Sequence, residues 1–165
     1  MSVIDNAIDY FGYLMDNYIT LEVQVMMLFV AIFTAPLIYS DLKTRTVTDR
    51  SLARAVIGSS LVFLFFIKNY EIDLVLFVLP MISIIIVFAF NMWKPADRIL
   101  FIPLIALASI TGVDGWFIMA VLPILICQIA RLLKIEGSKI PMIPILVLTW
   151  FLAVIWACIS WHFIT

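Results

Sequence analysis

Two aspartates in this sequence have the type and setting for acid–base chemistry. Asp41 follows an apolar stretch that ends at Tyr39, and Asp97 precedes another that begins at Ile99. Two carboxyl groups that share a proton can activate a water molecule for attack on a peptide carbonyl, one acting as base and the other as acid. Acids at helix ends are also ordinary, and Pro95 followed by Asp97 is a dipole-favourable helix start. The residues therefore permit an aspartic protease without requiring one.

The elements that would position these aspartates are membrane helices. The chain has 165 residues, of which 65% are hydrophobic, against about 45–50% in soluble domains. A helical span takes about 20 residues, and the apolar stretches cover residues 23–39, 52–67, 74–92, 99–113, 116–133 and 140–164. We therefore predict an all-α polytopic membrane protein with six transmembrane helices in a bundle over residues 21–165. The second and fourth stretches are short for a full crossing.

The segment before the bundle, residues 1–20, is predicted to form an amphipathic helix at the membrane surface. Apolar side chains recur at helical spacing from Val3 to Tyr18, and the acids Asp5, Asp9 and Asp16 lie elsewhere on the helix. The segment lacks the Lys and Arg of a secretory signal, so the first span is expected to remain. Residues 1–165 would then form a single integral membrane domain.

The distribution of charge predicts the orientation, because short loops rich in Lys and Arg stay cytoplasmic. With the N-terminus outside, nine of the ten basic residues lie on the inner face, and only Lys68 lies outside. The acids left on the inner face are Asp41, Asp49, Asp97 and Glu136. We therefore expect a multi-pass protein of the cell membrane with its candidate site on the cytoplasmic face.

Other kinds of site have little support. The net charge of −1 argues against nucleic-acid binding. Cys127 and Cys158 lie far apart in apolar runs, and the single histidine, His162, has no Cys or carboxylate near it in sequence. We expect no metal and no organic cofactor, and the lack of a histidine beside the serines disfavours a serine hydrolase.

Two further motifs carry a family resemblance. The segment Asp41-Leu42-Lys43-Thr44-Arg45-Thr46-Val47-Thr48-Asp49 resembles the first motif of the type IV prepilin peptidases, in which an Asp is followed by a basic stretch, Ile or Val, Pro, and Asn or Asp. Thr48 stands in place of the usual Pro. Lys139-Ile140-Pro141-Met142-Ile143-Pro144-Ile145-Leu146 resembles the I-P-F-x-P-x-L signature that opens the family's last helix. These enzymes, which include the archaeal preflagellin peptidases, are membrane aspartic proteases of the G-x-G-D class.

The resemblance departs from the family pattern at one place. The G-x-G-D motif is here Lys94-Pro95-Ala96-Asp97, which keeps the Asp and neither glycine. Glycine gives the backbone a freedom that Lys and Pro lack. Many bacterial members carry an additional N-terminal domain with paired cysteines, and we expect no such domain here. The chain is similar in size to the compact, peptidase-only members.

The resemblance implies an aspartic endopeptidase with Asp41 and Asp97 as catalytic residues. Its substrates would be pilin-like or archaellin-like precursors, cut between a short basic leader and an apolar segment held in the lipid bilayer. Asp49 and Glu136 would meet basic leader residues, although a helix N-cap is the simpler role for Asp49 and a solvated surface position the simpler one for Glu136. The alternative is a noncatalytic assembly or scaffold protein of the same fold.

The resting proton can also be assigned from helix dipoles. Asp41 lies at a helix C-terminus, which disfavours a carboxylate, and Asp97 lies at a helix N-terminus, which favours one. On this basis alone we expect Asp97 to be ionised and Asp41 to hold the proton.

Overall fold

The computed structural model describes residues 19–67, 74–133 and 140–164, and these residues form helices joined by short connections. In chain order the helices are α2 (Leu21–Thr44), α3 (Asp49–Ile67), α4 (Leu74–Ala89), α5 (Pro95–Ile110), α6 (Val113–Leu132) and α7 (Met142–Ile164). The described part of the chain contains no strand. The predicted all-α class is confirmed, whereas the predicted amphipathic helix of residues 1–20 falls almost wholly outside the described ranges.

Within the described part of the chain, four helices are long and apolar enough to cross a membrane. These stretches are Leu21–Thr44, Asp49–Ile67, Val113–Ala130 and Met142–Ser160. The second predicted stretch therefore lies in a helix of sufficient length, because α3 begins at Asp49, before the apolar run itself. The third is shorter than predicted: α4 has 16 residues and stops at Ala89, since the next residues form a turn in which Asn91 has a φ of 47°. Asparagine tolerates this left-handed conformation better than most residues.

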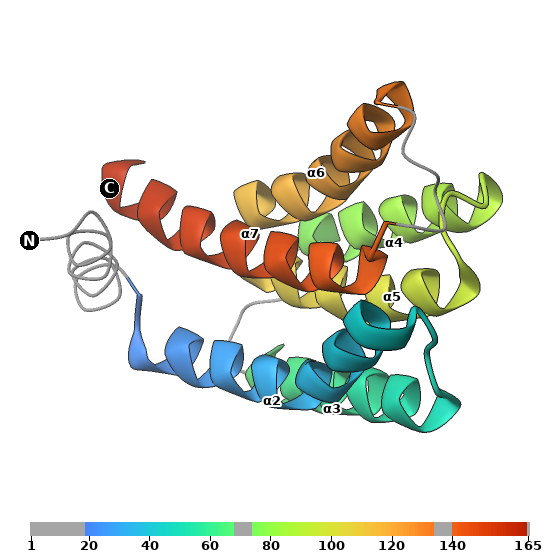
Figure 1. The fold of residues 1–165 in the computed structure, drawn as a ribbon. Coiled ribbons are helices and arrows are strands. Elements are labelled where there is room, and N and C mark those ends of the chain that lie inside the picture. Colours follow the sequence, from blue (N-terminus) through green and yellow to red (C-terminus); the bar gives the residue numbers. More distant parts are fainter. Residues whose placement is uncertain (1–18, 68–73, 134–139, 165) are drawn as a thin grey trace, which may run out of the picture.

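Helix α5 also has only 16 residues, and it lies at the centre of the bundle (Figure 1). It packs against α3, α4, α6 and α7. Its fully buried side chains are Leu100, Phe101, Leu104, Ile105, Leu107 and Ala108. Because protein covers most of this helix, its burial does not depend on matching the thickness of a bilayer.

The outer helices expose large apolar side chains, as expected of a surface that faces lipid. Exposed examples lie on α2, α3, α4 and α7: Leu28, Leu64, Ile85, Leu148 and Trp156. On the inside, Gly58 of α3 lies directly against the ring of Phe33 from α2, and a Cβ atom at residue 58 would come within 2.2 Å of that ring. Glycine is therefore required where α2 and α3 approach one another.

Short local devices fix the helix ends that surround the candidate site. Helix α2 ends where Arg45 adopts a φ of 57° and its N–H donates to the carbonyl oxygen of Asp41 at 3.2 Å. Helix α3 begins after Thr48, whose Oγ1 accepts from the N–H of Ser51 at 3.3 Å. Thr48, rather than Asp49, is thus the N-cap, which corrects the simpler role expected for Asp49. Helix α5 begins with Lys94 in an extended conformation and Pro95 in its first turn.

Candidate active site

Asp41 lies in the last turn of α2, with 8% of its surface exposed. Its Oδ2 atom accepts a hydrogen bond of 3.3 Å from the backbone N–H of Ile143, in the first turn of α7. The first N–H groups of a helix have no partner within the helix and carry the positive end of its dipole. The carboxyl group of Asp41 is therefore held by a helix N-terminus that lies far away in the sequence.

Ile143 is the second residue of α7, so its N–H has no carbonyl partner within the helix and can donate to Asp41. Pro144 has no N–H, and the N–H of Ile145 donates to the carbonyl oxygen of Pro141 at 3.4 Å. The two prolines of the Ile140–Leu146 segment thus leave few donors in the first turn of α7, and Ile143 provides one of them. Sequence reasoning missed Ile143, because a backbone donor carries no side-chain signal.

Asp97 lies in the first turn of α5, with 4% of its surface exposed. A backbone hydrogen bond from Lys94 reaches its carboxyl group, as in the N-terminal boxes in which the third helical residue bonds back to the N-cap. The preceding segment is fixed by packing: the rings of Trp93 and Phe101 meet edge to face with their centroids 5.1 Å apart. Asp97 lies outside the four stretches that are long and apolar enough to span a membrane.

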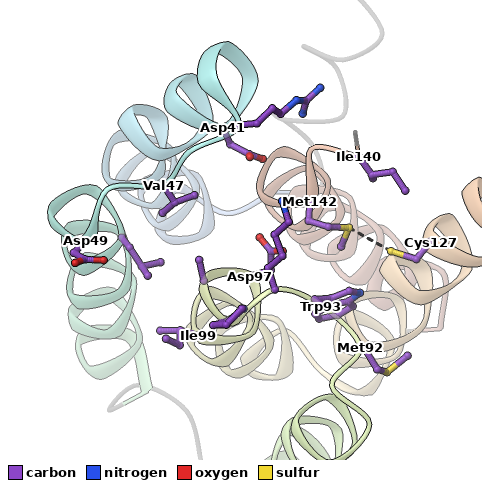
Figure 2. A pocket seen from close by; sticks show the side chains of 15 residues that line it. Asp41, Val47, Asp49, Met92, Trp93, Asp97, Ile99, Cys127, Ile140 and Met142 are labelled. Carbon is purple, nitrogen blue, oxygen red and sulfur yellow. Dashed lines mark hydrogen bonds between the residues drawn. The ribbon is translucent and has the colours of Figure 1, made fainter. Parts of the chain in front are cut away.

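Both aspartates line one cavity of about 570 Å³ at the end of the bundle. Figure 2 shows Asp41 from α2 and Asp97 from α5 with their carboxyl groups turned into this space. The remaining lining residues come from the α2–α3 connection, α3, the α4–α5 connection, α5, α6 and the start of α7 with the residues just before it: Arg45, Val47, Asp49, Leu52, Met92, Trp93, Lys94, Pro95, Ala96, Ile99, Cys127, Ile140 and Met142. The sequence-predicted pair is therefore brought together, although 55 residues separate its members.

The electrostatics of the pair reverse the expected proton assignment. Burial and then the neighbouring Asp41 carboxyl raise the pKa of Asp97 to about 6, while the charge of Lys94 and its backbone hydrogen bond lower it. The hydrogen bond from Ile143 meanwhile stabilises a negative charge on Asp41. Below about pH 6 Asp97 therefore keeps its proton, contrary to the expectation that it is ionised. The dipole argument failed because desolvation of Asp97 outweighs the N-terminus of its own helix.

The two expected leader-binding acids have different outcomes. Asp49 is the first residue of α3; its side chain is exposed and lines the same cavity (Figure 2). Glu136 lies outside the described residues.

Two basic residues, Arg45 and Lys94, also line the cavity. Their positions in the sequence indicated only charges that set the orientation in the membrane. Lys43 instead donates to the hydroxyl of Tyr39 at 3.0 Å and lies over its ring. The sequence feature that could have identified these two basic residues is their position, because Arg45 lies four residues after Asp41 and Lys94 three residues before Asp97.

The α4–α5 connection, residues 90–94, is held without a glycine. The guanidinium of Arg98 donates through Nη1 to Asn91 Oδ1 at 2.6 Å, and it stacks over the ring of Phe88 at 5.4 Å. Arg98 thereby ties the beginning of the connection to the first turn of α5.

Within the ranges 19–67, 74–133 and 140–164, no group of three or more His, Cys, Asp or Glu side chains is arranged to hold a metal ion.

The arrangement can therefore do the chemistry of paired carboxyl groups. Two buried carboxyl groups, of which Asp97 has a pKa raised to about 6, line an open cavity of about 570 Å³. Comparisons of the chain with known protein families, with curated proteins and with solved structures give no match.

Proposed function

We propose that this protein is a membrane aspartic endopeptidase that removes the short basic leader of type IV prepilin-like or preflagellin-like precursors at the cytoplasmic face. The observation that carries the proposal is the meeting of two buried carboxyl groups, from the end of α2 and the start of α5, in one cavity. The motif resemblance around Asp41, Asp97 and Ile140–Leu146 supports the choice of substrate. Neither line of support depends on the other.

In the proposed reaction Asp41 acts first as the base. It takes a proton from a water molecule as the water oxygen bonds to the peptide carbonyl carbon, and Asp97 gives its proton to the carbonyl oxygen. The C–N bond of the resulting gem-diol then breaks. Asp41 gives its proton to the leaving amine, and Asp97 takes a proton back from a gem-diol hydroxyl. The pair is thereby restored without any group that the chain does not supply.

Asp49 supports the proposed preference for a basic leader. Its exposed carboxylate lines the cavity on the α3 side, and the hydroxyl of Thr48 already caps the helix. Its position leaves it available to a Lys or Arg of the substrate. Asp49→Asn should raise the KM for a leader that contains Lys or Arg several-fold, because an exposed ion pair between Asp49 and the leader contributes about 1 kcal/mol to binding. A precursor with a neutral leader provides the matched substrate, whose KM should not change.

The test is cleavage of a synthetic precursor by the purified protein in lipid vesicles. The precursor carries a leader of Lys and Arg residues followed by an apolar segment of about 20 residues. Asp41→Asn and Asp97→Asn should each abolish cleavage. Asp114→Asn is the matched control. Asp114 lies in the first turn of α6, which follows the far end of α5 from Asp97, and it accepts a hydrogen bond from Ser160 at 2.8 Å. The substitution therefore makes the same change of side chain away from the candidate site.

The outcome separates the enzyme from a noncatalytic assembly protein of the same fold. A wild-type protein that is correctly inserted and cleaves no precursor would favour the assembly protein. Cleavage by both Asn variants at the wild-type rate would remove Asp41 and Asp97 from the chemistry and with them the proposed mechanism. Insertion of every variant is checked by its elution as a single species in detergent.

A further inference from the structure

A second cavity, of about 290 Å³, opens between α4 and α6. We name it the α4–α6 groove. Its own lining is mainly apolar, with two amide side chains: Ile86, Phe90, Asn91, Ile124 and Gln128. Phe90 is 75% exposed, so the groove is open toward the surroundings of the bundle. The proposed chemistry does not use any of these residues.

The shape of the groove follows from how α4 and α6 are joined. The indole Nε1 of Trp116, near the start of α6, donates to the hydroxyl of Ser83 on α4 at 3.0 Å. This hydrogen bond pins the two helices together at one level. Beyond it, toward the aspartates, α6 leans away from α4 (Figure 1), and the groove fills the space between Ile86 and Ile124. The groove therefore lies on the side of this contact that faces the aspartate cavity, with which it shares lining residues.

The groove and the aspartate cavity share one wall. Met92, Trp93 and Cys127 line both. Trp93 is fixed against Phe101, and the thiol of Cys127 lies 3.3 Å from the sulfur of Met142, so the wall is built from defined contacts. Met92 is unbranched and only partly buried, and methionine side chains adapt readily to a neighbour. A peptide that leaves the groove beside Met92 arrives at the two carboxyl groups.

From this continuity we infer that the α4–α6 groove receives the apolar helix of the substrate next to the bond that is cut. The inference rests on the proposed function, because that function requires a substrate whose helix lies in the bilayer beside the enzyme. The lining changes from apolar at Ile86 and Ile124 to amide at Asn91 and Gln128, as the substrate changes from helix to polar leader. The volume accommodates side chains of one helix face, since a whole helix is about 10 Å across.

A second apolar groove provides an internal control. It has about 270 Å³, lies between α2 and α3, and is lined by Phe29, Phe33, Leu61, Val62, Phe65 and Phe66. It shares no lining residue with the aspartate cavity. Lipid chains can enter both grooves, because both are mainly apolar. A substrate helix directed to the aspartates should enter only the α4–α6 groove.

Photo-cross-linking distinguishes the two grooves without requiring cleavage. The photoreactive residue p-benzoylphenylalanine replaces Ile124 in one variant and Leu61 in another, each in vesicles with the synthetic precursor. Phe90 offers a second position in the α4–α6 groove if the variant at 124 does not fold. We expect precursor adducts at least about fivefold more abundant at 124 or 90 than at 61, suppressed by excess unlabelled precursor and not by the leader peptide alone. Equal yields at both grooves, or adducts with lipid only, would overturn the inference.

Kinetics provide the second measurement. Ile124→Trp fills the α4–α6 groove, and Leu61→Trp makes the same change in the control groove. The quantity compared is the ratio of kcat/KM for the full precursor to kcat/KM for a short leader peptide. Ile124→Trp should lower this ratio at least about tenfold. Leu61→Trp should leave it unchanged. An unchanged ratio for both variants refutes the groove. Failure of the wild type to cleave either substrate refutes the proposed function instead, while the cross-linking result still decides the groove.

Discussion

Asp97→Asn should make the protein more stable while removing its activity. The pKa of Asp97 rises from an ordinary 3.8 to about 6 because the carboxyl group is buried and lies near Asp41. A shift of about two units corresponds to about 3 kcal/mol, at about 1.4 kcal/mol per unit. The folded protein bears this cost whenever Asp97 is ionised, and an asparagine of the same shape does not bear it.

The sign of the effect with pH follows from where the proton is held. Below about pH 4 the carboxyl is protonated in both the folded and the unfolded chain, so it contributes no pH dependence. Between pH 3.8 and about 6 the folded chain keeps a proton that the unfolded chain has released, so the free energy of unfolding falls as pH rises. Above about pH 6 the full cost is present. The advantage of Asp97→Asn therefore grows from pH 4 to pH 7 and then levels off.

The assay is thermal unfolding of the detergent-solubilised protein at closely spaced pH values from 4 to 8. For a chain of this size 1 kcal/mol shifts Tm by about 2–4 °C, so a cost of about 3 kcal/mol should widen the gap between variant and wild type by about 6–12 °C. Asp114→Asn, which removes an exposed acid from the first turn of α6, controls for the general effect of lost charge. Parallel curves for Asp97→Asn and wild type across this range would refute the argument that burial raises the pKa of Asp97.

Three further predictions follow from the same contacts. Lys94→Met removes a charge that lowers the pKa of Asp97, so the descending limb of the kcat profile with pH should move to higher pH. A bulky maleimide on Cys127, which lines the cavity, should block cleavage, and a Cys127→Ala variant should be resistant. Gly58→Ala places a Cβ atom against the ring of Phe33, so it should lower the free energy of unfolding by about 1–3 kcal/mol, and Phe33→Leu should restore much of this loss in the double variant.

The convergence of Asp41 and Asp97 could be predicted because it depends only on the order of apolar stretches. Successive helices of a membrane bundle alternate in direction, so the end of α2 and the start of α5 fall at the same end. The same rule places the beginning of α7 there. The difference in burial between α4 and α5 could not be predicted from the sequence, because it depends on α5 packing against four other helices. Hydropathy alone treats both as similar short apolar segments.

The proton assignment could not be predicted, because it depends on tertiary contacts. Asp41 lies at the C-terminus of its own helix, which argued for a protonated carboxyl, yet it receives the N–H of Ile143 from the N-terminus of α7. Asp97 has the opposite combination, a favourable helix terminus and an enclosed position. For Asp97 the burial supplied by other helices outweighs the dipole of its own helix.

The departure from the glycines of the G-x-G-D motif has a local structural explanation. Lys94 has φ and ψ of −62° and 154°, an extended conformation open to any residue, and Pro95 begins α5 where a missing N–H costs nothing. The positive φ in this connection belongs to Asn91, whose side chain is held by Arg98. The backbone that presents Asp97 therefore needs no glycine at 94 or 96. The absence of those glycines is consequently weak support for a noncatalytic protein, because the Arg98–Asn91 contact and the packing of Trp93 on Phe101 hold the segment before Asp97.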